Sequence, residues 1–187
     1  MDAAAVVTQP DEQTWITCAQ HGDRQAFGEL VRRHRQGVVN VVYRMCGDAG
    51  VAEDAAQEAF LRAWQNLGRY NPRFAFRSWV YRIALNLAVD ALRRERPTCD
   101  LAAEPLVSTA DGPEACLVRK QQAEQVRRAV LDLPPASRSV VVLREYEGLS
   151  YHEIAEALDI PMGTVMSRLN YARCQLRRSL SCHAEER

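Results

Sequence analysis

The sequence has few aromatic residues, a single lysine and no long apolar run. Aromatic side chains make up 7% of its 187 residues, and no apolar stretch approaches the roughly 20 residues that a membrane-spanning helix needs. Residues 1–10 also lack the basic segment followed by an apolar stretch that marks a signal peptide. These absences predict a cytoplasmic protein with no direct membrane insertion.

Catalytic and metal-binding patterns are missing as well. The six cysteines include no C-x-x-C pair, and the four histidines are scattered along the chain. Cys174, Cys182 and His183 could be imagined as a metal or redox cluster, but zinc sites usually show tight ligand pairs, so buried and inert thiols are the simpler interpretation. No Ser-His-Asp, paired-carboxylate or phosphate-loop arrangement appears. We therefore expect no enzyme activity, no metal and no cofactor.

Charge is balanced overall but unevenly distributed. Residues 15–96 hold 13 Arg against 8 acidic residues, and residues 119–187 hold 11 basic against 9 acidic residues. Residues 97–118, between these blocks, hold 4 acidic residues and no basic one. Two basic blocks suit binding to a polyanion, although two solvated helical surfaces would give the same pattern.

Nearly all of the chain has the apolar spacing of helices, and strand-like alternation is absent. Helices are predicted over residues 23–45, 51–67 and 77–94, with breaks at residues 47–50 and 68–72. Pro97 ends the third helix, because proline cannot continue a helical hydrogen-bond pattern. In the second helix the candidate core residues are Ala55, Phe60, Leu61 and Trp64.

The C-terminal part is predicted to begin after a linker. Residues 97–113 contain three prolines and few residues that could form a core. Helices then follow over residues 114–131 and 137–145. The fold is therefore expected to be all-α, with two small helical domains joined by a flexible linker.

A helix-turn-helix is the clearest local feature. Ser150 and Glu153 form an S-x-x-E capping box that marks a helix start. A tight turn at residues 159–160 and Pro161 then precede a second helix. Its apolar stripe is Val165, Leu169, Ala172 and Leu176. The opposite face is polar, as in a recognition helix that enters the major groove, although any helical hairpin in a bundle can show such a stripe.

Several segments together resemble a known family. The segment "LPPASRSVVVLREYEGLSYHEIAEALDIPMGTVMSRLNYARCQL" resembles region 4 of extracytoplasmic-function sigma factors of the sigma-70 family. The segments "DRQAFGELVRRH", "AEDAAQEAFLRAW" and "FRSWVYRIALNLAVDALRR" resemble region 2 of the same family. The resemblance divides the chain into a tail (1–14), region 2 (15–96), an acidic linker (97–118), region 4 (119–180) and a second tail (181–187).

The resemblance implies a function and its partners. In that family, region 2 binds the β′ clamp helices of core RNA polymerase and opens the minus-ten element. Region 4 binds the β flap and reads the minus-thirty-five element of promoter DNA. An anti-sigma factor is expected to control the protein, because most members of the family are held by one.

The resemblance also assigns residues to each surface. The core polymerase-binding residues are Asp54, Gln57, Glu58 and Arg62. The minus-ten residues are Tyr70, Arg73, Arg77, Trp79 and Asn86, with Tyr70 expected to stack on a base. Trp79 and its neighbour Tyr81 could belong to the core instead. The minus-thirty-five residues are Thr164, Met166, Ser167, Arg168, Asn170, Tyr171 and Arg173.

Two departures from the family pattern affect the expected promoter letters. Met166 stands where the family usually has a basic residue, and Tyr171 where it often has Arg. The main alternative function is a conventional helix-turn-helix regulator with a helical sensor domain, but such a domain has no need of the aromatic and Arg-rich segment at residues 70–94. A protein-interaction module that no longer binds DNA is a third alternative.

Overall fold

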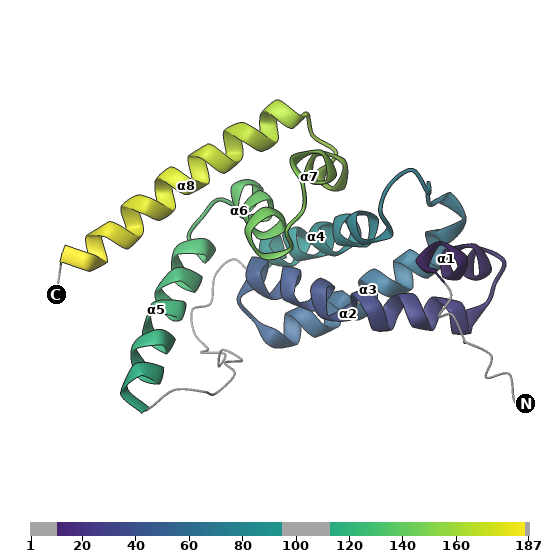
Figure 1. The fold of residues 1–187 in the computed structure, drawn as a ribbon, viewed down its shortest axis with the longest axis horizontal. Coiled ribbons are helices and arrows are strands. Elements are labelled where there is room, and N and C mark those ends of the chain that lie inside the picture. The colour runs from purple at the N-terminus through teal and green to yellow at the C-terminus, as the bar shows by residue number, and fades with distance from the viewer. Residues whose placement is uncertain (1–10, 95–112, 186–187) are drawn as a thin grey trace, which may run out of the picture.

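The computed structural model describes residues 11–94 and 113–185, and this part of the chain is helical, without strands. The helices form an N-terminal half, α1–α4, and a C-terminal half, α5–α8 (Figure 1). The expected all-α architecture of two helical units is confirmed. In chain order the elements are α1 (Glu12–Gln20), α2 (Arg24–Cys46), α3 (Ala49–Asn66), the 3₁₀ turn η1 (Leu67–Arg69), α4 (Phe76–Arg94), α5 (Pro113–Leu131), α6 (Pro135–Val141), the π-helical turn η2 (Val142–Tyr146), α7 (Tyr151–Leu158) and α8 (Met162–Glu185).

Local capping sets the helix ends of the N-terminal half. The Asp23 carboxylate accepts hydrogen bonds from the backbone N–H groups of residues 25 and 26, which starts α2. Gly47 ends α2 in a left-handed conformation with φ 80°, which a residue with a Cβ rarely adopts. Asp48 then caps α3. The chain therefore reverses within a few residues, so α2 and α3 pack side by side.

Helices α2, α3 and α4 pack against one another, and α1 packs on α2. Leu30, Val38, Val41 and Val42 of α2 are fully buried. One predicted core residue is wrong, because the Leu61 side chain is 58% exposed. The buried face of α3 is instead lined largely by small residues at helical spacing, Ala52, Ala56, Ala59 and Ala63. These small side chains let α3 approach its neighbours closely.

The helix-turn-helix forms as predicted. Ser150 and Glu153 make both hydrogen bonds of the capping box at the start of α7. Asp159 ends α7 with φ 54°, so the chain turns sharply into α8. Val165, Leu169 and Ala172 of the predicted stripe are at most 1% exposed, and Leu176 packs partly buried beside them. This burial fixes which face of α8 points outward.

Three predicted boundaries differ from the structure. Helix α1 begins inside the predicted tail 1–14, α5 begins inside the predicted linker 97–118, and α8 continues past residue 180 to Glu185. Pro97, most of that linker, and the side chains of Cys182 and His183 lie outside the described residues. Cys18 and Cys174 are exposed, which corrects the expectation of buried thiols for these two.

Residues 11–94 and 113–185 contain neither a candidate membrane span nor a candidate metal site. None of the helices there is both long and apolar enough to cross a bilayer. That part of the chain also holds no group of three or more His, Cys, Asp or Glu side chains arranged to bind a metal ion.

Candidate nucleic-acid interface

One exposed strip runs along α3. Asp54 and Gln57 are exposed, and Glu58 accepts a hydrogen bond from Arg62 at 2.7 Å. Leu61 lies between these polar residues with 58% of its side chain exposed. Spacings of three and four residues place all five on one face of the helix. The four predicted polymerase-binding residues thus share a surface, together with an apolar residue that the sequence analysis assigned to the core.

The loop between α3 and α4 is built around three aromatic rings. Tyr70 packs on Trp79 and Phe76, with ring centroids 5.1 Å and 5.7 Å away. Its hydroxyl donates to the Phe74 carbonyl at 2.5 Å, its side chain is 5% exposed, and burial raises the pKa of its hydroxyl. Tyr70 therefore cannot stack on a base in this structure, which corrects the prediction. Phe74, with 39% exposure, is the accessible aromatic residue of this loop.

The other predicted minus-ten residues lie around this loop and along α4. Arg73 and Asn86 are exposed, and Trp79 is half-buried against the aromatic cluster. Arg77 is half-buried, and its guanidinium donates to Glu153 of α7 at 3.2 Å. Arg82, one helical turn and a half further, donates to Asp159 at 2.8 Å. Two arginines of α4 are thus paired with carboxylates of the helix-turn-helix.

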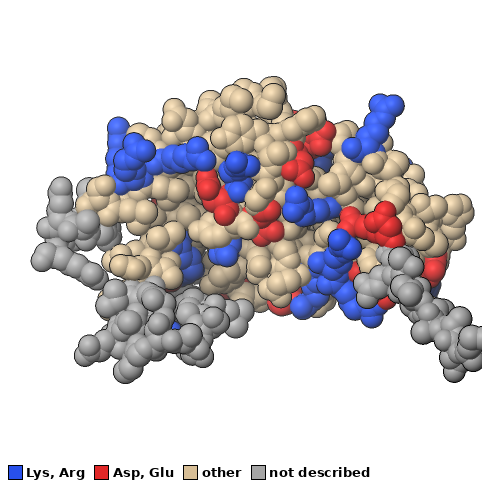
Figure 2. All heavy atoms as spheres, viewed as in Figure 1, with Lys and Arg blue, Asp and Glu red and all other residues tan. Residues whose placement is uncertain are grey.

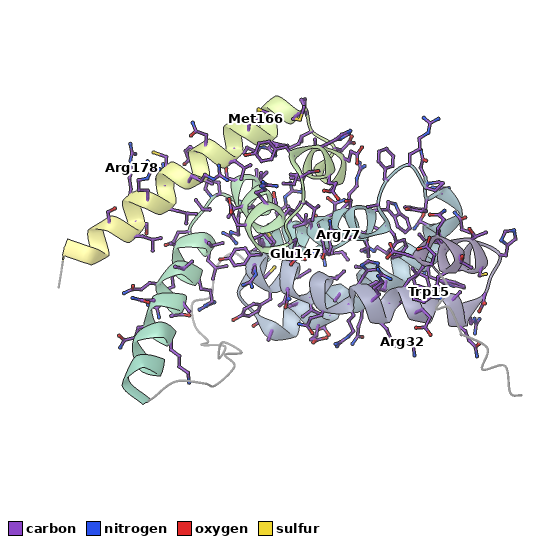
Figure 3. The ribbon with its side chains drawn as sticks, in the orientation of Figure 1. Trp15, Arg32, Arg77, Glu147, Met166 and Arg178 are labelled. Carbon is purple, nitrogen blue, oxygen red and sulfur yellow. The ribbon has the colours of Figure 1, made fainter. Side chains whose placement is uncertain are left out.

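A hydrogen bond and a cation–π contact complete this interface between the halves. The Tyr81 hydroxyl donates to Glu147 at 2.5 Å, and burial of Tyr81 raises the pKa of that hydroxyl. The Arg44 guanidinium lies 3.8 Å from the centroid of the Tyr146 ring. Arg77 and Glu147 lie in the middle of the molecule, where α4 meets the C-terminal half (Figure 3). Tyr81 is 2% exposed, which resolves the open alternative in favour of the core.

A cavity of about 590 Å³ opens beside these contacts. Its walls come from the aromatic loop and α4 on one side and from the helix-turn-helix on the other. The lining includes Phe74, Trp79, Arg82, His152, Ile160 and Met162. The closest part of the interface is therefore tied by charged and polar pairs, while a mainly apolar hollow remains next to them.

The outward side of α8 carries the predicted minus-thirty-five residues. Met166, Ser167, Asn170 and Tyr171 are exposed, and Thr164 and Arg168 are half-buried. Arg173 donates to Glu145 at 2.7 Å, which raises the pKa of the guanidinium. Basic side chains gather along α8 in the space-filling view (Figure 2). The helix thus combines a few uncharged side chains near its start with arginines further along.

Comparison with known proteins shows which family of proteins this chain resembles. A family model described as Sigma-70 region 2 matches residues 30–98, and one described as Sigma-70, region 4 matches residues 123–176. The chain is 35% identical over 179 residues to the RNA polymerase sigma-H factor of Pseudomonas aeruginosa, covering 90% of this chain and 93% of that protein. It is 37% identical over 176 residues to the ECF RNA polymerase sigma factor SigW of Bacillus subtilis, covering 88% and 94%.

The chain belongs to the extracytoplasmic-function sigma factors of the sigma-70 family. Its fold also resembles that of CnrH in complex with the cytosolic domain of CnrY, with a TM-score of 0.71 and 26% identity over 91% of this chain and 97% of that chain. Sigma factors of this family bind core RNA polymerase and direct it to promoter DNA. In this sigma factor, region 2 corresponds to the α2–α4 bundle and region 4 to the helices that surround the helix-turn-helix.

The parts of this sigma factor that depend on tertiary packing could not be predicted from the sequence. Leu61 was predicted to lie in the core, but it is exposed and lies on the same face of α3 as Asp54 and Gln57. Phe74 was passed over in favour of Tyr70. The pairing of Glu147 and Glu153 with α4 gave no signal in the sequence, because acidic residues on a helix surface are common in any soluble protein.

Proposed function

We propose that this sigma factor uses three separate surfaces, the α3 strip, the α3–α4 loop with α4, and the outer side of α8. They would bind core polymerase, the minus-ten element and the minus-thirty-five element, respectively. The observation that carries the proposal is the order of the two family regions, with the helix-turn-helix in the second. The assignment of residues to surfaces rests on the family motifs and on the exposure of the side chains.

The α3 strip suits a polar protein interface with an apolar centre. Asp54 and Gln57 offer hydrogen-bonding groups, and the Glu58–Arg62 pair offers both signs of charge. Charged groups of this kind steer a partner and fix its register more than they add affinity. The exposed Leu61 supplies the apolar surface that such an interface needs at its centre. This strip is the proposed contact with the β′ clamp helices.

The α3–α4 loop suits single-stranded DNA. Arg73 is exposed beside Phe74, so a positive charge and an accessible aromatic face lie together. Such a combination binds backbone phosphate and stacks on an unpaired base. Asn86, exposed on α4, has the amide that can bond a base edge. We assign Phe74 the stacking role. Tyr70 supports the loop from inside, because its buried ring packs on Phe76 and Trp79 and its hydroxyl donates to the Phe74 carbonyl.

The second helix of the helix-turn-helix suits duplex DNA. Ser167 and Asn170 face outward near the start of α8, where a recognition helix contacts base edges. Arg168, Arg173, Arg177 and Arg178 lie around and beyond them and would bind phosphate. Arg173 would have to leave or share Glu145 when it does so.

Control by an anti-sigma factor is part of the proposal. The similar protein CnrH was solved with the cytosolic domain of CnrY bound to it. An inhibitor that covered the α3 strip or held the two halves together would block polymerase binding or promoter binding.

The polymerase surface can be tested by competition. Labelled wild-type protein is bound to core RNA polymerase, and unlabelled variants are titrated against it. Asp54→Asn and Leu61→Ser are expected to compete at least tenfold less well than the wild type. Glu53→Gln is the matched control, since Glu53 lies on the same helix but pairs with Arg35 of α2 at 2.5 Å. Equal competition by all three variants would show that the α3 strip does not bind the polymerase.

A further inference from the structure

The start of α8 exposes apolar side chains where the groove of DNA is expected. Met166 is 48% exposed and Tyr171 is 46% exposed, and neither side chain has a hydrogen-bond or ion-pair partner among the described residues. Met162, at 50%, belongs to a different surface, because it lines the cavity that faces α4. Met166 lies at the outer edge of the molecule, near the N-terminal end of α8 (Figure 3).

The register of α8 places Met166 beside Asn170. Val165 is fully buried, so Met166, one residue later, is turned about 100° away from the core. Asn170 follows one turn further along and is exposed as well. Gly163 precedes Met166 by nearly one turn on the same side, and a Cβ there would meet no atom within 4 Å. The first turn on this side of the helix therefore carries no bulky side chain at Gly163, so DNA can approach the Met166 side chain.

The chemistry of Met166 selects one partner in the major groove. A thioether has no donor and is only a weak acceptor, so it cannot bind phosphate or pair with a base edge as Arg or Asn does. The one apolar group that base pairs present in the major groove is the C5-methyl of thymine. The amide of an asparagine side chain forms hydrogen bonds with the N6 and N7 atoms of adenine. Both side chains of this strip therefore favour A·T pairs.

We infer that Met166 determines specificity in this sigma factor by packing on a thymine methyl group of the upstream promoter element, next to a base pair that Asn170 reads. The inference rests on the proposed function of α8. Burying one methyl group is worth about 0.8 kcal/mol, which corresponds to about a fourfold change in affinity. The effect is confined to base pairs near the N-terminal end of α8.

Replacement of thymine by deoxyuridine tests the inference, because deoxyuridine lacks only that methyl group. Run-off transcription with this sigma factor and core polymerase first identifies a promoter. The probes are synthetic duplexes of that promoter, in each of which one upstream thymine is replaced. Wild-type holoenzyme is expected to bind one or two of these duplexes about fourfold more weakly. Met166→Ala holoenzyme is expected to bind all of them equally, and the matched control Met162→Ala to keep the wild-type pattern.

The outcomes separate this inference from the proposed function. If scrambling the upstream element leaves wild-type binding unchanged, α8 does not read that element and the proposed function of α8 fails. If the element is required but has no A·T pair, or no deoxyuridine substitution weakens wild-type binding, the thymine contact is wrong and the proposed function stands. If Met166→Ala keeps the wild-type pattern, another residue makes the contact.

Discussion

At the scale of single residues, replacement of Arg138 is expected to lower the stability of the folded protein strongly. It is 7% exposed, and its guanidinium donates to the carbonyls of Met45, Leu131 and Leu133, the last at 2.9 Å. Met45 belongs to α2, so this one side chain joins the two halves of the protein. Burial lowers the pKa of Arg138 from its ordinary value, but the group stays charged at neutral pH.

Arg138→Met is expected to lower the free energy of unfolding by about 3 kcal/mol, since three buried carbonyls lose their charged donor. Urea denaturation measures the change. Arg128→Met is the control, because Arg128 is exposed and its ion pair within the described part of the chain is with Glu124, one turn away on the same helix. Its cost is expected to stay within about 0.5 kcal/mol. Equal effects of the two variants would contradict the role assigned to Arg138.

The proposed contact with the minus-ten element depends most on Phe74. Phe74→Ala is expected to lower run-off transcription from duplex promoters about tenfold, since base stacking on an aromatic ring is worth about 1–3 kcal/mol. A template already melted around the minus-ten element should need less help from stacking in its opening, so the loss there should be smaller. Core polymerase binding should not change. Normal transcription by Phe74→Ala from duplex promoters would contradict the stacking role.

At the scale of elements, Glu153 links a helix cap to the interface between the halves. Its carboxylate accepts from the Ser150 backbone N–H at 2.8 Å and from Arg77 at 3.2 Å. The hydrogen bonds from Ser150, with Arg77 adding to them, hold the pKa of Glu153 below its ordinary value of 4.5. A depressed pKa stabilises the folded state above pH 4.5, and this stabilisation is lost as the pH falls through the folded-state pKa.

Glu153→Gln isolates the charge, because glutamine can also complete a capping box. The variant is expected to unfold with about 0.5 kcal/mol less free energy than the wild type at pH 7, a modest value because the pair is partly exposed. The difference should shrink as the pH falls below 4.5. Urea denaturation over a pH series measures it. A difference that grows toward acid pH would contradict the assigned sign.

The sequence predicted elements well where the signal is local. The capping box at Ser150 and the stripe from Val165 to Leu176 specify α7 and α8 through contacts within a few residues. Helix α1 was missed, because the short run from Glu12 to Gln20 has a weak apolar pattern and becomes a helix by packing on α2. The burial of Tyr70 was equally invisible, since it depends on Trp79 and Phe76 rather than on its own neighbours in the chain.

At the scale of the whole molecule, the two proposed DNA-binding regions, α4 with its loop and the helix-turn-helix, contact each other. Helix α4 packs on α7 and is tied to the C-terminal half by Arg77–Glu153, Arg82–Asp159 and Tyr81–Glu147. Positions minus ten and minus thirty-five lie about 85 Å apart along straight duplex DNA, at 3.4 Å per base pair. With α4 packed directly on α7, the two proposed DNA-binding surfaces are held close together. Under the proposed function, the halves therefore have to separate before a promoter is bound.

Holding the halves together is expected to block initiation. Arg82→Cys and Asp159→Cys, joined by a short bis-maleimide, would fix the contact that now measures 2.8 Å between their side chains. The six native cysteines are first replaced by serine, so that the linker joins only the two introduced thiols. The linked protein should lose at least tenfold in run-off transcription, and the unlinked double variant should not. Full activity of the linked protein would contradict the requirement for separation.

The central claim is that this chain directs core RNA polymerase to a two-part promoter, and run-off transcription on a genomic library tests it most directly. Purified protein and core polymerase are incubated with the library, and the 5′ ends of the transcripts are sequenced. We predict defined start sites that share one element near minus ten and another near minus thirty-five, and none of these starts without the protein. The contradicting result is that the protein leaves the start sites of core polymerase unchanged, or that it binds duplex DNA tightly as a dimer without polymerase, as a conventional regulator would.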